Sequence, residues 1–318
     1  MTELLWMFSV ILFILGFVLL IVGGNLLVNG AVALAQKFNI SPLLIGLTIV
    51  GFGTSVPELI ASLLAINQDV SDLAVGNVVG SNIANILLVL GLAACIHPIR
   101  VSNLSLHRDG KFLLLATFAL CIASIFGKIN FILGLAMCAC LGYYIYYAYQ
   151  TEKKQLEQAQ LRHPAQHHRR RKIIWFDIIF IILGIGLIFW GAQILVDNAK
   201  LLAQKMGIPA EIIGLTLIAV GTSLPELATS VIASIKKQPD IAFGNIVGSN
   251  IYNALFILGF LALFNTVPVN SGVHMLWMTG ATLLLLGIAY RKHALSRKTG
   301  MLFLGIYVAY LFFLSYVA

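Results

Sequence analysis

Charged residues are scarce in this chain. Only 10% of its 318 residues are Asp, Glu, Lys or Arg, while 60% are hydrophobic and the mean hydropathy is +0.96. Soluble domains carry about 25% charged residues, so the scarcity excludes an ordinary soluble protein. The apolar runs that fill the chain are each about 20 residues long, which is the length that crosses a bilayer as a helix.

Cysteine is also rare, and its placement excludes the usual metal and redox motifs. The four cysteines, Cys95, Cys121, Cys138 and Cys140, lie in or beside apolar runs and form no CxxC spacing. Cys138 and Cys140 would not share a helix face, because residues two apart diverge on a helix. We interpret all four as small buried side chains, and we expect no cofactor.

The apolar runs predict an all-α integral membrane protein with ten transmembrane helices. The expected crossings lie near residues 5–23, 43–66, 72–95, 111–127, 130–149, 173–200, 211–235, 240–264, 273–290 and 300–317. The first run begins near Glu3, has no basic residue at its start and precedes no A-x-A-like cleavage site. We therefore interpret it as a helix and not as a signal peptide.

The net charge of +8 is explained by basic residues on one side of the membrane. With ten crossings, alternate loops fall on opposite sides, and every Lys and Arg except Lys128, Lys200 and Lys205 falls on the same side. The positive-inside rule makes that side cytoplasmic and places both termini outside, in the periplasm of a cell with an inner membrane. The charge thus indicates orientation in the membrane and contact with lipid, not nucleic-acid binding. No obligatory protein partner is evident.

One hydrophilic stretch, residues 150–172, divides the chain into two units of five crossings, residues 1–149 and 173–318. It breaks at Pro164 and ends in the basic cluster HHRRRK, which we interpret as an orientation signal in a cytoplasmic loop. Binding of anionic lipid and metal sensing are the alternatives. Because five is odd, the second unit enters the membrane from the opposite side, which predicts an inverted repeat.

The two units also share long motifs. GFGTSVPELIAS at 51–62 returns as AVGTSLPELATS at 219–230, and GNVVGSNIAN at 76–85 returns as GNIVGSNIYN at 244–253, both 168 residues later. Each copy of the first motif carries one glutamate, Glu58 or Glu226, where a carboxylate is costly. Packing alone would not preserve these acids, so the duplication indicates a functional site.

The first motif gathers oxygen atoms. On a helix, Thr54, Ser55 and Glu58 share one face. Pro57 lacks an N–H, so the helix should open there and free backbone carbonyls near residues 51–53. Carboxylate, hydroxyl and carbonyl oxygens are the ligands that Ca²⁺ and Na⁺ prefer.

The repeated acids favour a cation site over a purely structural one. A single copy of the motif would be explained equally well by a structural role, as a Pro-kinked helix whose glutamate is protonated. Two copies in an inverted repeat would bring Glu58 and Glu226 together, and two bare negative charges repel each other unless protons or cations neutralise them.

The second motif adds an amide and hydroxyl stripe in each unit. Its members, spaced i, i+4 and i+8 on one helix face, are Asn77, Ser81 and Asn85, and then Asn245, Ser249 and Asn253. Glycines in the same motif form small-xxx-small faces for close helix packing. A hydrogen-bond ladder between helices explains part of the stripe, and the flank of an ion site explains its position beside the glutamate motif.

At these residues the chain resembles the sodium/calcium exchanger family of the calcium/cation antiporter superfamily, and it looks like a prokaryotic member. The resemblance implies ten helices, with the motif helices central and the first and sixth helices sliding across them. It assigns cation ligation to Glu58, Glu226, Thr54, Ser55, Thr222, Ser223, the carbonyls of Gly51 and Ala219, Ser81 and Ser249, with Asn85 and Asn253 as a flanking pair. Several relatives have an acid in that flanking pair, so the two amides here argue against potassium dependence.

The expected function is antiport of Na⁺ and Ca²⁺ by alternating access at a midplane site. Ca²⁺/H⁺ exchange through the same two glutamates is the nearest alternative, followed by a potassium-dependent exchanger and a cation channel. We expect no enzyme: an intramembrane hydrolase using Ser55 or Ser223 would need a nearby His or Lys, and neither motif supplies one.

Overall fold

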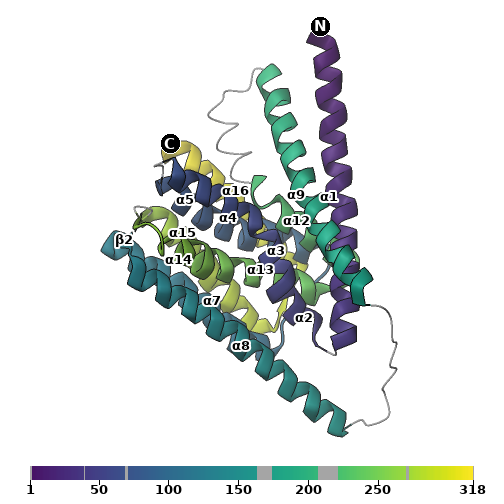
Figure 1. Cartoon of the computed structure of the whole chain (residues 1–318), viewed down its shortest axis with the longest axis vertical. Helices are drawn as coiled ribbons and strands as arrows, with labels where there is room; N and C mark the ends of the chain where they lie inside the picture. The colour runs from purple at the N-terminus through teal and green to yellow at the C-terminus, as the bar shows by residue number, and fades with distance from the viewer. Residues whose placement is uncertain are drawn as a thin grey trace.

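The computed structural model describes residues 2–38, 40–68, 71–162, 174–206, 221–269 and 272–317, and these residues are almost entirely helical (Figure 1). The helices are α1 (Thr2–Phe38), α2 (Pro42–Ile45), α3 (Gly51–Thr54), α4 (Val56–Asn67), α5 (Ser71–Ala84), α6 (Gly91–Ile96), α7 (Asn103–Phe126), α8 (Phe131–Arg162), α9 (Ile174–Lys205), α12 (Leu224–Ile235), α13 (Pro239–Ile251), α14 (Leu258–Leu261), α15 (Gly272–Lys292) and α16 (Arg297–Val317). Three π-helical segments join some of them: η1 (Gly46–Val50), η2 (Asn85–Leu90) and η4 (Tyr252–Ile257).

Nine helices in the described part of the chain are long and apolar enough to cross a membrane. Of the predicted crossing at 211–235, residues 211–220 lie outside the described residues, and α12 forms the rest. The all-α membrane class with interrupted central helices is therefore confirmed. The helices α1, α8 and α9 extend further than the expected crossings, and α8 continues through the first part of the hydrophilic stretch to Arg162.

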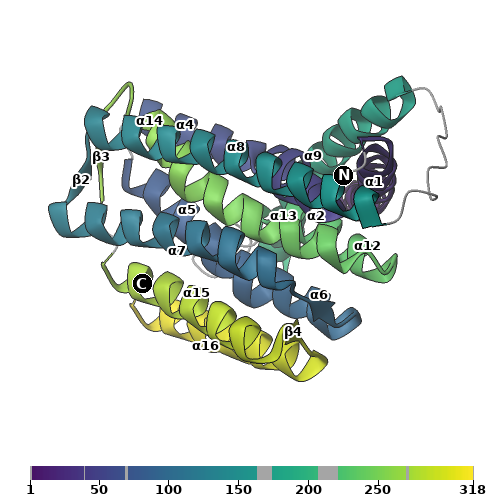
Figure 2. The ribbon, with the colours of Figure 1, turned by 90° about the horizontal axis from the view of Figure 1, so that it is seen from below.

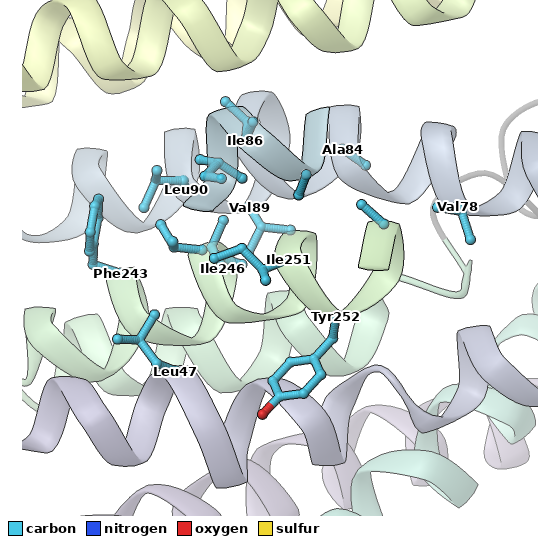
Figure 3. Packing of buried hydrophobic residues seen from close by; sticks show 14 of the residues in the cluster. Leu47, Val78, Ala84, Ile86, Val89, Leu90, Phe243, Ile246, Ile251 and Tyr252 are labelled. Carbon is cyan, nitrogen blue, oxygen red and sulfur yellow. The ribbon is translucent and has the colours of Figure 1, made fainter. Parts of the chain in front are cut away.

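The motif helices form the centre of the bundle. In the most apolar part of α13–α14, 94% of the residues are buried, and in that of α5–α6 72% are buried. The corresponding share is 28% for α1 and for α9. In Figure 3, Ile86 and Leu90 of η2 lie over Ile246 and Ile251 of α13, with Leu47 of η1 on the other side of α13. The outer helices instead expose large apolar side chains such as Phe17, Ile182 and Trp190, as expected for contact with lipid.

Two small antiparallel sheets show that the two units run in opposite directions. Strand β1 (Ile99–Arg100), just after α6, pairs with β4 (Ala294–Leu295). Strand β3 (Val267–Pro268), just after α14, pairs with β2 (Lys128–Ile129). The helix α7 separates β1 from β2, so the equivalent helices α6 and α14 end at opposite ends of the bundle (Figure 2). This is the geometry of an inverted repeat.

Helices α1 and α9 pack against each other as an antiparallel pair beside the central bundle (Figure 1). Small residues allow the close approach: a Cβ on Gly23 would lie 2.8 Å from the carbonyl oxygen of Gly184, and a Cβ on Gly16 would lie 2.8 Å from that of Gly191. Gly16 and Gly184 are equivalent in the repeat, as are Gly23 and Gly191, so the pseudo-two-fold axis passes between these helices. An ion pair of Lys37 with Asp177 joins one end of the crossing.

Candidate cation site

The two predicted acids lie near each other in the buried centre of the fold. Glu58 lies in the first turn of α4 and Glu226 in the first turn of α12, and both side chains are 0% exposed. Their carboxyl groups are close enough to repel each other when charged. None of their four carboxyl oxygens has a hydrogen-bond partner among the described residues. Buried carboxyl groups without partners are costly, which indicates that something else neutralises them.

The chain breaks in the same way before each acid. Ser55 has φ −84° and ψ 0°, and Ser223 has φ −87° and ψ 5°, so neither continues the helix. Pro57 and Pro225 are then the second residues of α4 and α12, in the first turn that their fixed φ favours. The predicted opening beside Pro57 is therefore present. It places each glutamate at a helix N-terminus, where the helix dipole stabilises a negative charge.

Hydroxyl groups from both units lie beside Glu226. The Thr54 hydroxyl donates to Asn245 Oδ1 at 3.0 Å and lies 3.3 Å from the Ser249 hydroxyl. The hydroxyls of Thr54, Ser55 and Ser249 lie close to the Glu226 carboxyl group and interact with it, although none of them meets the full geometry of a hydrogen bond. The Oγ atoms of Ser55 and Ser223 are buried and have no partner in the described residues.

The remaining hydroxyls of the predicted set also cross between units. Ser81 and Thr222 lie with their hydroxyl oxygens 3.3 Å apart. The structure thus pairs Ser81 with Thr222 and gathers Thr54, Ser55 and Ser249 near Glu226. In the described part of the chain, no hydrogen bond of its hydroxyl places Ser223 with them. Cation ligation by these residues remains a prediction.

The predicted carbonyl ligands have different outcomes. The Gly51 carbonyl accepts hydrogen bonds from the Ser249 hydroxyl at 3.2 Å and from the Ser55 amide at 3.2 Å. It is therefore engaged in this structure and not freed by the break. A Cβ on Gly51 would lie 3.1 Å from the Ser249 amide nitrogen, so a glycine lets α13 approach closely. Ala219 lies outside the described residues.

The asparagines that begin the amide stripe hold the glutamate helices. Asn77 Nδ2 donates to the Glu58 carbonyl at 3.2 Å and to Ser62 Oγ at 3.1 Å. Asn245 Nδ2 makes the equivalent bonds to the Glu226 carbonyl at 3.4 Å and to Ser230 Oγ at 3.0 Å. Our sequence analysis did not single out these two serines, although both lie in the repeated motif 168 residues apart.

The flanking amides lie beside a second, unexpected pair. Asn85 Nδ2 donates to Asn250 Oδ1 at 3.0 Å, whereas both side-chain polar atoms of Asn253 are buried without a partner in the described residues. Asn82 and Asn250 each donate to the other's backbone carbonyl at 3.2 Å. Asn82 and Asn250 are the asparagines of the GSN sequence in the two copies of the second motif, and our sequence analysis did not use this repetition.

A cavity reaches the site from the molecular surface. Its volume is about 240 Å³ and it lies between α4, α9 and α12. Its wall includes Pro57, Thr222 and Pro225 at the site and Gln193, Asp197 and Lys200 toward the end of α9. An ion could therefore approach Thr222 through a passage that carries one acid and one base.

The side chains at the site are not those of a typical transition-metal site. No group of three or more His, Cys, Asp or Glu side chains in the described ranges could hold a metal ion. Two carboxylates with neutral hydroxyl and amide oxygens instead suit hard cations such as Ca²⁺ and Na⁺.

Comparison with known proteins agrees with this chemistry. The family described as sodium/calcium exchanger protein matches residues 8–150 and 176–316. The putative antiporter CaxA of Alkalimonas amylolytica is 36% identical over 96% of this chain and 98% of its own. The sodium/calcium exchanger MaX1 of Methanosarcina acetivorans is 31% identical over the same shares.

The fold has a solved counterpart. A structure of the sodium-calcium exchanger NCX_Mj, soaked with Na⁺ and Sr²⁺, superposes with a TM-score of 0.83 and 32% identity, covering 96% of this chain and 98% of that one. The family match, the full-length relatives and this superposition lead to one conclusion: the chain belongs to the sodium/calcium exchanger family.

Proposed function

We propose that this protein exchanges Na⁺ for Ca²⁺ across the cell membrane by alternating access, with both ions competing for the site between Glu58 and Glu226. The observation that carries the proposal is the set of buried carboxyl oxygens without partners, with hydroxyls from both units beside Glu226. One Ca²⁺ or two Na⁺ would neutralise the pair. The inward sodium gradient would then drive Ca²⁺ out of the cell.

The same pair accounts for strict exchange. Without bound cations, occlusion would leave two uncompensated charges in a low-dielectric interior, which raises the barrier to reorientation by several kcal/mol. The protein would therefore change its facing direction only when loaded. This requires no cofactor and no covalent step, and a relative named as a sodium/calcium exchanger supports the choice of ions.

The test is ion flux in proteoliposomes made with Glu58→Gln and Glu226→Gln. Each change keeps the shape of the side chain and removes its charge, so we expect Na⁺-driven Ca²⁺ flux to fall at least a hundredfold while the protein remains folded. Asp72→Asn, an acid in the first turn of α5 outside the site, is the control and should transport normally. Undiminished flux in either glutamine variant would refute the proposal.

The coupling ion is tested separately, because the unpaired carboxyl groups would also accept protons. Wild-type Ca²⁺ flux is measured first with a sodium gradient and no pH gradient, and then with a pH gradient and no sodium gradient. We expect flux in the first condition. Flux only in the second condition would show Ca²⁺/H⁺ exchange, and a requirement for K⁺ would show potassium dependence.

A further inference from the structure

Two asparagines at equivalent positions of the repeat fix each other's orientation. Asn82 and Asn250 are 3% and 1% exposed, and each Nδ2 donates to the other's backbone carbonyl at 3.2 Å. A backbone carbonyl can only accept a hydrogen bond, whereas an amide side chain presents a donor on one side and an acceptor on the other. The backbone therefore determines which way each amide faces.

This orientation is passed on to Asn85. Because Asn250 Nδ2 is held by the Asn82 carbonyl, Asn250 Oδ1 faces away from it and accepts from Asn85 Nδ2 at 3.0 Å. Asn85 must present its NH₂ to that oxygen, so its own Oδ1 lies on the opposite side. That oxygen is fully buried and has no partner among the described residues.

Asn85 lies on the helix face that is turned toward the site. Asn85 is four residues after Ser81, so the two share a helix face, and the Ser81 hydroxyl is 3.3 Å from that of Thr222. An amide oxygen directed toward the site attracts a cation. The reversed amide would direct two N–H donors at the cation and repel it.

We propose that Asn250 is a positioning residue, which orients the Asn85 amide so that its oxygen, not its nitrogen, is offered to the transported cation. This rests on the proposed cation site but assigns a role to a residue that does not itself reach the ion. The equivalent bond in the other unit, from Asn253 Nδ2 to Asn82 Oδ1, is absent, since both atoms are without partners in the described residues.

This broken symmetry supplies a matched control. Asn250→Ala and Asn82→Ala each remove the same volume and one donor of the reciprocal pair, but only Asn250→Ala releases Asn85. We expect both variants to lose similar thermal stability. Isothermal titration of purified protein with Ca²⁺ should show about tenfold weaker binding for Asn250→Ala and less than a twofold change for Asn82→Ala.

Two further variants separate positioning from a general structural defect. Asn250→Asp should retain wild-type affinity, because a protonated carboxyl group can donate to the Asn82 carbonyl and accept from Asn85. In an Asn85→Ala background, Asn250→Ala should weaken Ca²⁺ binding no further, as a double-mutant cycle requires for a residue acting through its neighbour.

The proposal is overturned if Asn82→Ala and Asn250→Ala weaken binding equally, or if Asn250→Ala still weakens binding without Asn85. Failure of the proposed function has a different signature. In that case wild-type protein shows no sodium-driven Ca²⁺ flux, while the titrations still report whether Asn250 controls Ca²⁺ affinity.

Discussion

At the scale of single residues, Thr54 links the two units. Its hydroxyl donates to Asn245 Oδ1, and Asn245 in turn holds the backbone carbonyl of Glu226. Thr54→Val keeps the shape but leaves the buried Asn245 oxygen without its donor, which costs about 1–3 kcal/mol. We expect Ca²⁺ affinity, measured by titration, to fall about tenfold, equivalent to about 1.4 kcal/mol.

Thr48→Val is the matched control for this prediction. The Thr48 hydroxyl in η1 donates to the Leu44 carbonyl of the preceding helix α2 at 2.7 Å and takes no part in the site. Its loss should leave Ca²⁺ affinity within twofold of wild type. If the two valine variants bind Ca²⁺ alike, the hydroxyl of Thr54 has no special role.

The duplicated motifs made Glu58, Glu226 and their hydroxyl neighbours predictable, because an acid repeated in apolar chain needs a reason. The roles of Asn82, Asn250, Ser62 and Ser230 were not predictable in the same way. Repetition marks a residue as constrained, but a buried amide or hydroxyl can serve an ion, a neighbouring helix or a backbone carbonyl. Only the spatial arrangement distinguishes these uses.

At the scale of elements, the crossing of α1 and α9 depends on glycine. A Cβ on Gly184 would lie 2.7 Å from the Leu27 amide nitrogen and 2.8 Å from the Gly23 carbonyl oxygen, and backbone atoms cannot rotate away. Gly184→Ala should therefore separate the helices and destabilise the protein by about 1–3 kcal/mol. Thermal unfolding in detergent measures the loss, and we also expect slower transport, because the family resemblance implies that these helices slide.

Gly186→Ala, on the same helix, is the control for that crossing. A Cβ at Gly186 meets nothing within 4 Å, and alanine is the better helix former. Its melting temperature should equal or exceed that of wild type. Equal losses in both variants would mean that the close contact at Gly184 does not explain the destabilisation.

A buried ion cluster joins α7 to α8. Arg108 Nε donates to Asp109 at 2.7 Å and its Nη1 donates to Glu152 at 3.1 Å, while the Tyr144 hydroxyl donates to Asp109 at 3.1 Å. Arg108→Met would leave two buried acids without their cation, at a cost of about 3–5 kcal/mol. Denaturation should detect this loss, whereas Lys111→Met on the exposed face of α7 should change stability little. Similar stability of the two methionine variants would contradict a structural role for the cluster.

Some elements followed directly from the sequence and others did not. Proline marked the breaks before α4 and α12, because it has no N–H and favours the first helical turn. The π-helical segments η2 and η4 and the two-residue strands were not predicted. A π-helical turn shifts the helical register slightly, and two residues are too few to show the alternating pattern of a strand.

At the scale of the whole molecule, the two ends of the inverted repeat are not equivalent. On one side, the cavity of about 240 Å³ runs past Gln193 to Thr222. At the equivalent place on the other side, Lys236 Nζ donates to Asn29 Oδ1 at 2.6 Å and to the Asn25 carbonyl at 3.5 Å, joining α12 to α1. A cavity of about 280 Å³ also lies beside Asn29 and Lys236, but its described lining includes no residue of the site. Among the described residues, the cavity at Gln193 is therefore the one that leads to the site.

This asymmetry predicts which positions a water-soluble reagent can reach. Gln193 and Asn25 are equivalent in the repeat, but Gln193 lines the cavity while the Asn25 carbonyl accepts a hydrogen bond from Lys236. When the reagent is applied on the side of each position, to intact cells for Gln193→Cys and to inverted vesicles for Asn25→Cys, a membrane-impermeant maleimide should label Gln193→Cys at least tenfold faster, with the wild-type protein as the blank for its four native cysteines. Labelling of Gln193→Cys only in inverted vesicles would place the cavity on the cytoplasmic side and reverse the orientation predicted from the basic residues.

Bound Ca²⁺ should also affect this labelling. Because ion binding should close the passage around the neutralised glutamates, saturating Ca²⁺ should slow the labelling of Gln193→Cys. Unchanged labelling would show that the cavity does not lead to the ion site.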